Sequence, residues 1–464
     1  MKLMRDSGII SENETKLIID GALTILEKTG VKVENLTILQ KLADNGASVN
    51  FSNQSVRFRS SLIAEFIENS HKHEWTDIPV TYSGSAEIYH GLYLDPIDRN
   101  YKPWTEELIL DYCRLAKAIP NISGVSMLGM PATNWPLKLQ PLTEKIFCWK
   151  WGIRGGNSIW DTNLCPSIYR LWDTWAHDQG VDIKKHFNGT VYMISPLKFA
   201  AVEAEQYVYF AEQGLEVSVG SLGSLGGTSP VTPAGALALQ TAEGFFLNFL
   251  RRAFFGHMDL NLGNSLSVID MSTGSFQYGR PEQTLLNIAG SAVARMIGAT
   301  YSGHGGLSDA KEPGYEAASQ KVMSAVYNAQ AYGHGHIVCG LLAVDEVFSP
   351  EQLVLDAEAL SWLQHLSKGM EVNENTLALD VIDEAGWGGQ FLSHDHTASN
   401  FRSALWFPKI FSRETYSMYE SKKGLSEREA SRQQVRKLLS SAPKLEPQIS
   451  QSLEDKLWKI INNK

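Results

Sequence analysis

Short apolar runs alternate with amphipathic segments over roughly 250 residues of this chain. The runs have the length of buried strands, and the segments between them repeat apolar residues at helical spacing. This alternation predicts an α/β fold with a parallel sheet, and a closed (β/α)8 TIM barrel is the commonest form at this length. The pattern alone leaves a flat, doubly wound sheet open. Strands are expected at residues 125–129, 157–160, 191–195, 217–222, 259–265, 300–305 and 337–343, with an eighth near 86–94 or 378–383, and helices at 105–118, 201–213, 234–252, 282–296 and 315–331.

The pattern divides the chain into three parts. Residues 1–100 are expected to form a small N-terminal α/β cap, whose first helix begins at the capping box Ser11-Glu12-Asn13-Glu14 and stops at Gly30. Residues 101–385 are assigned to the TIM barrel, and residues 386–464 to a covering segment and C-terminal helices, one of them charged and near 426–440.

Composition and charge narrow the class of protein. The chain has 464 residues, of which 43% are hydrophobic, and its net charge of −10 argues against nucleic acid as a partner. Its four cysteines are widely spaced, which suits reduced thiols. The first six residues have no apolar signal core, and no apolar run reaches membrane-span length. We therefore expect a soluble cytoplasmic protein with no membrane partner.

A glycine-rich corner at residues 222–243 is the most informative motif. Thr232 and Pro233 have the residue types of a helix N-cap and first turn. Before them, Gly226, Gly227, Thr228 and Ser229 offer backbone N–H groups and hydroxyls next to a helix N-terminus, where a carboxylate or phosphate is favoured. The alternative is an ordinary strand-to-helix corner.

This corner resembles the central motif of the trimethylamine methyltransferase superfamily, Gly-Ala/Gly-Thr-x-Pro-Val-Thr-x-Ala-Gly-Ala followed by Ala-Glu. Other segments resemble that family's motifs in the same order. They are Ser195-Pro196-Leu197, Met271-Ser272-Thr273-Gly274 with Pro281-Glu282, Asp309-Ala310-Lys311 with Tyr315-Glu316, residues 351–358, and His394-Asp395-His396-Thr397 with Phe401-Arg402.

The resemblance implies a TIM barrel and a methyltransferase. Members that demethylate trimethylamine carry pyrrolysine, whereas this chain has only standard residues, with Cys339-Gly340 near the expected position. It therefore resembles the branch without pyrrolysine, which takes a methyl group from a quaternary amine such as glycine betaine or proline betaine. The methyl acceptor is cob(I)alamin on a partner corrinoid protein. No cofactor is expected on this chain, because neither Asp-x-His-x-x-Gly nor Gly-x-Gly-x-x-Gly appears. We also expect a homo-oligomer.

Candidate binding residues lie at predicted strand ends, where a TIM barrel carries its active site. A quaternary ammonium group favours aromatic faces, and a betaine carboxylate needs hydrogen-bond donors. For each aromatic residue the alternative is ordinary core packing. The aromatic candidates are Tyr93, Trp160, Tyr278, Tyr301 and Phe348, and the polar candidates are Ser195, Gly226, Gly227, Thr228, Ser229, His304 and the capping box that begins at Ser349.

Metal is not expected, although His394-x-His396 with His304 and Cys339 would supply zinc ligand types. A quaternary amine needs no metal to activate it, and the 394–402 motif is expected to shape a covering loop or to dock the corrinoid protein. His334 and His336 precede the last predicted strand and are expected to be structural. Two alternatives stay open: a zinc-dependent corrinoid methyltransferase for another methyl donor, and a non-catalytic betaine-binding protein.

Overall fold

The computed structural model describes residues 9–129, 136–156 and 158–462. Position 157, the first of one predicted strand, lies outside them. The N-terminal part contains three helices and three short strands, and Ser11 and Glu14 form the expected capping box at the start of the first helix. Its elements are α1 (Glu12–Lys28), β1 (Val31–Val33), α2 (Leu36–Asp44), β2 (Ser48–Asn50), β3 (Ser55–Arg57) and α3 (Ser60–Asn69), and β1 pairs with β10 (Lys198–Phe199) from later in the chain.

The rest of the body alternates parallel strands with helices, so the predicted mixed α/β class is confirmed. The strands are β4 (Thr81–Ile88), β7 (Val125–Met127), β8 (Arg154–Gly155), β9 (Gly189–Met193), β11 (Val217–Ser221), β12 (Ser224–Leu225), β13 (Asn261–Asn264), β14 (Ser267–Ile269), β16 (Thr300–Gly303) and β17 (His334–Cys339). The helices that follow them are α4 (Glu106–Lys117), α5 (Gln140–Trp151), α6 (Cys165–Gln179), α8 (Ala201–Glu212), α9 (Pro233–Phe255), α10 (Pro281–Ile297), α11 (Tyr315–Tyr332) and α12 (Pro350–Ser367).

Strand β4 is the strand that the hydrophobic pattern located only loosely. It lies between β17 and β7 and pairs with both in parallel. The parallel strands therefore begin at Thr81, inside the segment that was predicted to be a cap up to residue 100. Residues 378–383, the other position considered for a strand, fall within a helical segment, α14 (Leu379–Ala385).

Short strands and helices lie near the ends of the parallel strands. They are β5 (Leu92–Leu94), β6 (Tyr101–Pro103), β15 (Phe276–Gln277), β18 (Leu341–Leu342), β19 (Val347–Phe348), α7 (Ile183–His186) and the 3-10 turns η1 (Leu137–Leu139) and η2 (Thr162–Leu164). Strands β18, β19, β5 and β6 form one sheet, which joins the segment after β4 to the segment after β17.

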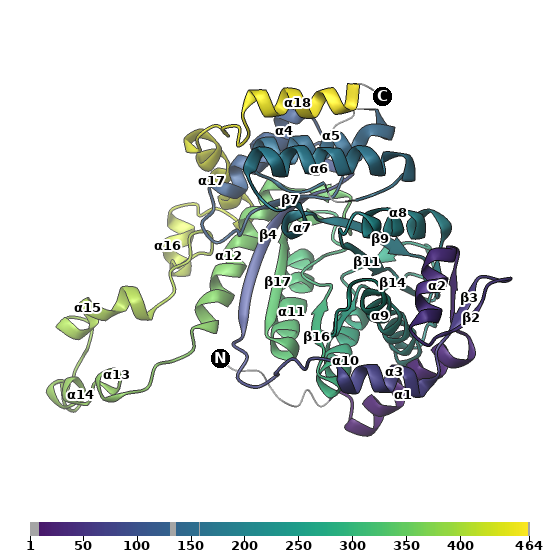
Figure 1. The fold of residues 1–464 in the computed structure, drawn as a ribbon. Helices are drawn as coiled ribbons and strands as arrows, with labels where there is room; N and C mark the ends of the chain where they lie inside the picture. The colour runs from purple at the N-terminus through teal and green to yellow at the C-terminus, as the bar shows by residue number, and fades with distance from the viewer. Residues whose placement is uncertain (1–8, 130–135, 157, 463–464) are drawn as a thin grey trace.

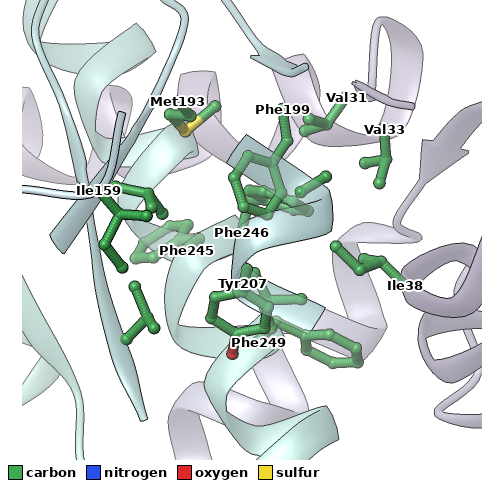
Figure 2. Packing of buried hydrophobic residues seen from close by; sticks show 14 of the residues in the cluster. Val31, Val33, Ile38, Ile159, Met193, Phe199, Tyr207, Phe245, Phe246 and Phe249 are labelled. Atoms are coloured by element: carbon green, nitrogen blue, oxygen red, sulfur yellow. The ribbon is translucent and has the colours of Figure 1, made fainter. Parts of the chain in front are cut away.

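The largest core cluster binds the N-terminal unit to the body. Val31, Val33 and Ile38 face the aromatic side chains of α8 and α9 (Figure 2). Phe249 is fully buried, and its ring packs edge-on against Phe58 at a centroid distance of 5.2 Å. Burying one such side chain contributes about 1.5–3 kcal/mol, so this cluster holds α1 to α3 against α9.

The C-terminal part is divided between the body and an extension. Helix α17 (Glu427–Ser441) packs on α12 and α4, and α18 (Gln451–Asn462) packs on α6 and α5. Between α12 and α17 lie α13 (Glu374–Leu377), α14, α15 (Asp395–Ala404) and α16 (Tyr416–Ser421). Helices α13 to α15 extend away from the rest of the chain (Figure 1), and the segment that follows returns to α12, where the N–H groups of residues 409–411 bond to Glu358. Within the described residues, no helix combines the length and apolarity needed to cross a bilayer.

A buried ion pair joins α11 and α12 beneath β17. Lys321 Nζ lies 2.6 Å from Asp356 Oδ2, and both side chains are almost fully excluded from solvent. The ammonium group also donates to the Val338 carbonyl at 2.8 Å. The carboxylate accepts two further hydrogen bonds, from the Gly340 N–H at 2.8 Å and the Gln352 amide at 2.7 Å. Both charges are thus compensated where water cannot reach them.

Replacing Lys321 alone should be costly. The substitution Lys321→Met leaves the Asp356 carboxylate buried without its counter-charge, and we expect the free energy of unfolding to fall by about 3–5 kcal/mol in urea denaturation. Lys321→Met combined with Asp356→Asn should recover part of that loss, because an amide needs no counter-ion. A loss below about 1 kcal/mol in the single variant would contradict this account.

Candidate active site

A cavity of about 560 Å³ opens beside the carboxyl ends of the parallel strands. Its lining comes from five segments: the residues that follow β11, those that follow β13, the hairpin of β14 and β15 with Tyr278 after it, the loop after β16, and the turn after β18. These segments meet because parallel strands end at the same edge. The lining residues are Leu222, Gly223, Ser265, Ser267, Gly274, Ser275, Phe276, Gln277, Tyr278, Lys311, Ala343, Val344, Asp345 and Glu346.

The turn that presents Asp345 has an unusual backbone. Ala343 and Val344 have φ angles of 51° and 70°, in the left-handed region that favours glycine. The N–H groups of these two residues bond to the carbonyls of Ala310 and Ser308, which holds the turn in place. Such strain is typical of segments that position a functional side chain. Burial raises the pKa of the Asp345 carboxyl, and the neighbouring Glu346 raises it further.

Three tyrosines lie near one another, and two of them, Tyr89 and Tyr278, also lie near Asp345. Tyr89 follows β4, Tyr192 lies on β9, and Tyr278 follows β15. Burial is the main cause that raises the pKa of Tyr278 to about 12, and Asp345, Tyr89 and Tyr192 raise it further. Burial also raises the pKa of Tyr89, with added effects of Asp345 and Glu144. Charged groups that shift one another's pKa lie within a short distance of one another.

Tyr192 shows that the interior between the strands is open. Its side chain is 45% exposed although β9 pairs with β11 and bridges to residue 158 on its other side. A Cβ on Gly220 would lie 2.8 Å from the Tyr192 ring, so only glycine fits beneath it on β11. The ring is therefore held against the neighbouring strand with one face available to a ligand.

His304 lies next to this group. Its ring packs edge-on against Tyr278 at a centroid distance of 4.8 Å. Burial lowers its pKa to about 4, so the imidazole is neutral at pH 7. Its backbone is held by Asn264 and Asn287, and its Nδ1 has no hydrogen-bond partner in the described parts of the chain. A buried, unpaired ring nitrogen beside the cavity suits contact with a bound polar group.

The backbone N–H groups of the glycine-rich corner already make hydrogen bonds within the corner. The N–H groups of Gly227, Thr228 and Ser229 all donate to the Ser224 carbonyl, and that of Gly226 donates to the Ser229 carbonyl. Thr228 Oγ1 accepts from the Ser224 N–H at 3.0 Å. The expectation that these N–H groups bind an anion is therefore wrong, because each already has a partner. Thr232 does occupy the N-cap position of α9 with Pro233 behind it, but its side chain makes no capping bond.

Several other candidates belong to the core or to the scaffold. Tyr93 and Phe348 are buried against Trp104, at centroid distances of 5.3 and 5.6 Å. Tyr301 packs on Tyr332. These three aromatic side chains pack against other rings of the scaffold, which is the alternative to a binding role, and none of them lines the cavity.

Two polar candidates are also engaged in the scaffold. Ser195 Oγ donates to the buried Glu243 carboxylate at 2.9 Å. Ser349 is fully buried and caps α12 by accepting from the Gln352 N–H. Trp160, by contrast, is 40% exposed at the strand ends, with its ring 6.4 Å from that of His90, the neighbour of Tyr89.

Sequence reasoning missed Tyr89, Tyr192, Asp345 and Lys311 as site residues. Tyr89 follows the strand that was located only loosely, and Tyr192 stands in an apolar run where a tyrosine looks like core. The signals for Asp345 and Lys311 were present, since Asp345 follows the last apolar run and Lys311 stands in a matched motif.

Histidines form a hydrogen-bonded ladder between β4 and β17. His334 bonds through its two ring nitrogens to Thr81 and Ser83, both at 3.0 Å. His336 bonds to Ser83 at 2.7 Å and Ser85 at 2.9 Å. The last strand thus starts at His334, three residues before the predicted start at 337. The structural role expected for both histidines agrees with these bonds.

Metal-ligand residue types do not gather in the described residues, where no group of three or more His, Cys, Asp and Glu side chains could hold an ion. His394 accepts from the His396 N–H as the N-cap of α15, and its other nitrogen lies 3.1 Å from Glu384. The 394–402 motif lies at the start of α15, which extends away from the body (Figure 1).

Sequence comparison defines the class to which this fold and cavity belong. Residues 170–460 match the profile of trimethylamine methyltransferase (MTTB), and the chain belongs to this family. It is 25% identical to a glycine betaine methyltransferase of Desulfitobacterium hafniense, over 98% of this chain and 97% of that one. A trimethylamine methyltransferase of Methanosarcina barkeri is 31% identical over 44% of this chain and 41% of that one. The crystal structure of the monomethylamine methyltransferase of Methanosarcina barkeri aligns with a TM-score of 0.44 at 10% identity, covering 96% of this chain and 95% of that one.

The ladder predicts a pH effect on stability. Burial, then His334 and Arg154, lower the pKa of His336 to about 4, below its value near 6.5 in the unfolded chain. The stabilisation is therefore complete above pH 6.5 and is lost as pH falls toward 4. Between pH 7 and 5, the wild type should lose about 2 kcal/mol relative to His336→Gln in denaturant titrations. Parallel stability curves would refute the assignment.

Proposed function

We propose that the parallel strands close into a (β/α)8 TIM barrel with a small N-terminal α/β cap and a C-terminal helical extension. Neighbouring pairings support this: β4 with β7, β7 with β8, β9 with β11, β12 with β14 and β13 with β16. A parallel bridge from Ser158 to Thr190 links the segment after β8 to β9, the Val338 N–H donates to the Gly306 carbonyl, and β17 pairs with β4. The cavity then lies at the mouth that carries active sites in such barrels.

We infer that this mouth binds a quaternary amine, most simply a betaine, and demethylates it. The observation that carries the proposal is that Tyr278 and Asp345 line one open cavity, with Tyr89 and Tyr192 close enough to Tyr278 to raise the pKa of its hydroxyl. Aromatic faces attract a quaternary ammonium by about 0.5–2 kcal/mol each, without needing a hydrogen bond that this cation cannot make. A carboxylate beside the faces adds charge attraction.

The carboxylate of a betaine also needs a partner. Lys311 lines the cavity, and its ammonium group donates to the Asp309 carbonyl at 2.6 Å, which holds the side chain near the rim. Asp309 in turn accepts hydrogen bonds from the N–H groups of Tyr278 and Gly279. These bonds join the loop that bears Lys311 to the loop that bears Tyr278. Lys311 supplies the positive charge, and neutral His304 supplies the nearby polar nitrogen.

The methyl transfer requires little from the protein beyond the positioning of the two substrates. Cobalt(I) of a partner corrinoid protein, the second substrate, donates the electron pair of the new Co–C bond. The N–CH₃ bond breaks and its electron pair stays on nitrogen, so the product is a neutral tertiary amine and no proton is required. The residues of the cavity hold the N–CH₃ bond in line and exclude water. The open interior around Tyr192 leaves a path by which the corrinoid can approach.

Two of the expected domain boundaries change. The cap ends near residue 80, and the barrel ends with α12 at Ser367. The chain binds no cofactor of its own, works in the cytoplasm and has no nucleic-acid or membrane partner. Its partners are a small quaternary amine and the corrinoid protein.

Purified protein mixed with cob(I)alamin should form methylcobalamin from a betaine and not from trimethylamine, followed by absorbance. The substitution Tyr192→Leu removes one aromatic face and should raise KM for the betaine by roughly 2- to 30-fold, whereas Tyr192→Phe keeps the face and should change KM little. Binding of a betaine without methylcobalamin would point to the sensor alternative. Activity that depends on bound zinc would point to the zinc enzyme.

The substitution Lys311→Met should weaken binding of betaines selectively. It removes a charged donor to the carboxylate, a loss of about 1.5–3 kcal/mol, so KM should rise by roughly 10- to 150-fold with little change in kcat. Choline has the same ammonium group and no carboxylate, so its weaker turnover should not change. Equal effects on both substrates would show that Lys311 acts on the fold instead.

A further inference from the structure

The extension at residues 369–425 has no core of its own. We call this segment, which includes α13 to α16, the arm. No residue in it is buried, and its helices α13 to α15 stand away from the body (Figure 1). Only the short stretch at residues 406–411 returns to the body, where it bonds to Ser361 and Glu358 of α12. Its helices have 4 to 10 residues. Helices this short are marginal in water by themselves, because their stability comes from packing.

The arm instead exposes large apolar side chains. Trp387 is 107% exposed and Leu392 is 84% exposed. Together the apolar side chains of the arm present on the order of 1,000 Å², which equals or exceeds one side of a standard protein interface. They are Met370, Val372, Leu377, Leu379, Ile382, Trp387, Phe391, Leu392, Leu405, Phe407, Phe411, Tyr416, Met418 and Leu425.

The body carries a matching apolar face. On the outer side of α10 and α11, a cavity of about 420 Å³ is lined by Leu285, Ile288, Met323 and Tyr327, among others. Met323 and Tyr327 are 59% and 51% exposed. Helix α1 packs on α9 and on part of α10, and α17 packs on α12. A reciprocal interface between two copies of a chain needs an apolar arm and an apolar face on each copy, and this chain has both.

We propose that the arm packs against a second copy of this chain, on the face formed by α10 and α11. The arm of each copy then packs on the α10 and α11 face of the other copy, which forms a dimer with two-fold symmetry. Reciprocal burial of two such arms gives about 2,000 Å² or more of apolar area, the range of permanent homodimers.

The position of the arm favours a second copy over the corrinoid protein as occupant. The arm leaves from the end of α12, where Gln364 Nε2 donates to the carbonyl of Tyr82 at the start of β4. That is the side opposite to the cavity mouth, which a corrinoid must reach. A partner that leaves after each turnover also suits a more polar surface than this one.

The full-length protein should sediment as a dimer at micromolar concentration. The double variant Trp387→Asp/Leu392→Asp should raise the dissociation constant by at least about 30-fold, because buried aromatic anchors are worth 2 kcal/mol or more. Both side chains lie outside the core of their own chain, so the circular dichroism of the variant should match the wild type. Amide exchange in α15 should also speed up on dilution to the monomer.

The matched control is Leu17→Asp on α1, a side chain that is 69% exposed outside the arm, which should leave the dissociation constant unchanged. A wild type that is monomeric at all concentrations would overturn the proposal. So would a dimer that is insensitive to the arm variants. If the chain alone is a monomer and the same variants weaken its complex with a corrinoid protein, the arm belongs to that partner.

Discussion

The parallel pairing of β4 with β17 is the contact on which the site depends. Six consecutive residue pairs, from Thr81 with His334 to Ala86 with Cys339, join segments about 250 residues apart. Backbone groups between two layers of side chains must be paired, so this register is strongly held. The chain that leaves β4 carries Tyr89, and the chain that leaves β17 carries Asp345. One ladder of backbone hydrogen bonds thus brings Tyr89 close to Asp345, and Asp345 lines the cavity.

The same strands separate an apolar outer side from a polar inner side. Between β4 and β17 the inner positions hold serine and histidine, whose polar atoms satisfy one another. Outside them, Ile337 and the stem of Lys321 are buried under α11 and α12. A polar interior costs less when small side chains leave it open to water, and the exposure of Tyr192 on β9 fits that condition. An open interior also gives a large cosubstrate room to approach.

The electrostatics of the cavity suit a cation that makes no hydrogen bonds. His304 stays neutral at pH 7 because burial disfavours its charged form, so it does not repel an ammonium group. The tyrosine hydroxyls stay protonated, since burial and Asp345 both raise their pKa. The negative charge that faces the cavity therefore comes from carboxylates such as Asp345, with Lys311 at a separate place on the rim. This separation of charges matches that of a betaine.

Local order in the sequence was enough to determine the alternation of strands and helices, the capping box at Ser11, the N-cap at Ser349 and the family, because each depends on neighbouring residues. It could not decide which aromatic residues face the cavity. A one-residue change of register turns a side chain to the other face, and this choice buried Tyr301 while leaving Tyr192 open. It could not show that the N–H groups of residues 226–229 already bond to the Ser224 and Ser229 carbonyls. Those outcomes depend on which distant segments of the chain come into contact, and so does the lack of buried residues in the arm. Only the tertiary structure decides these contacts.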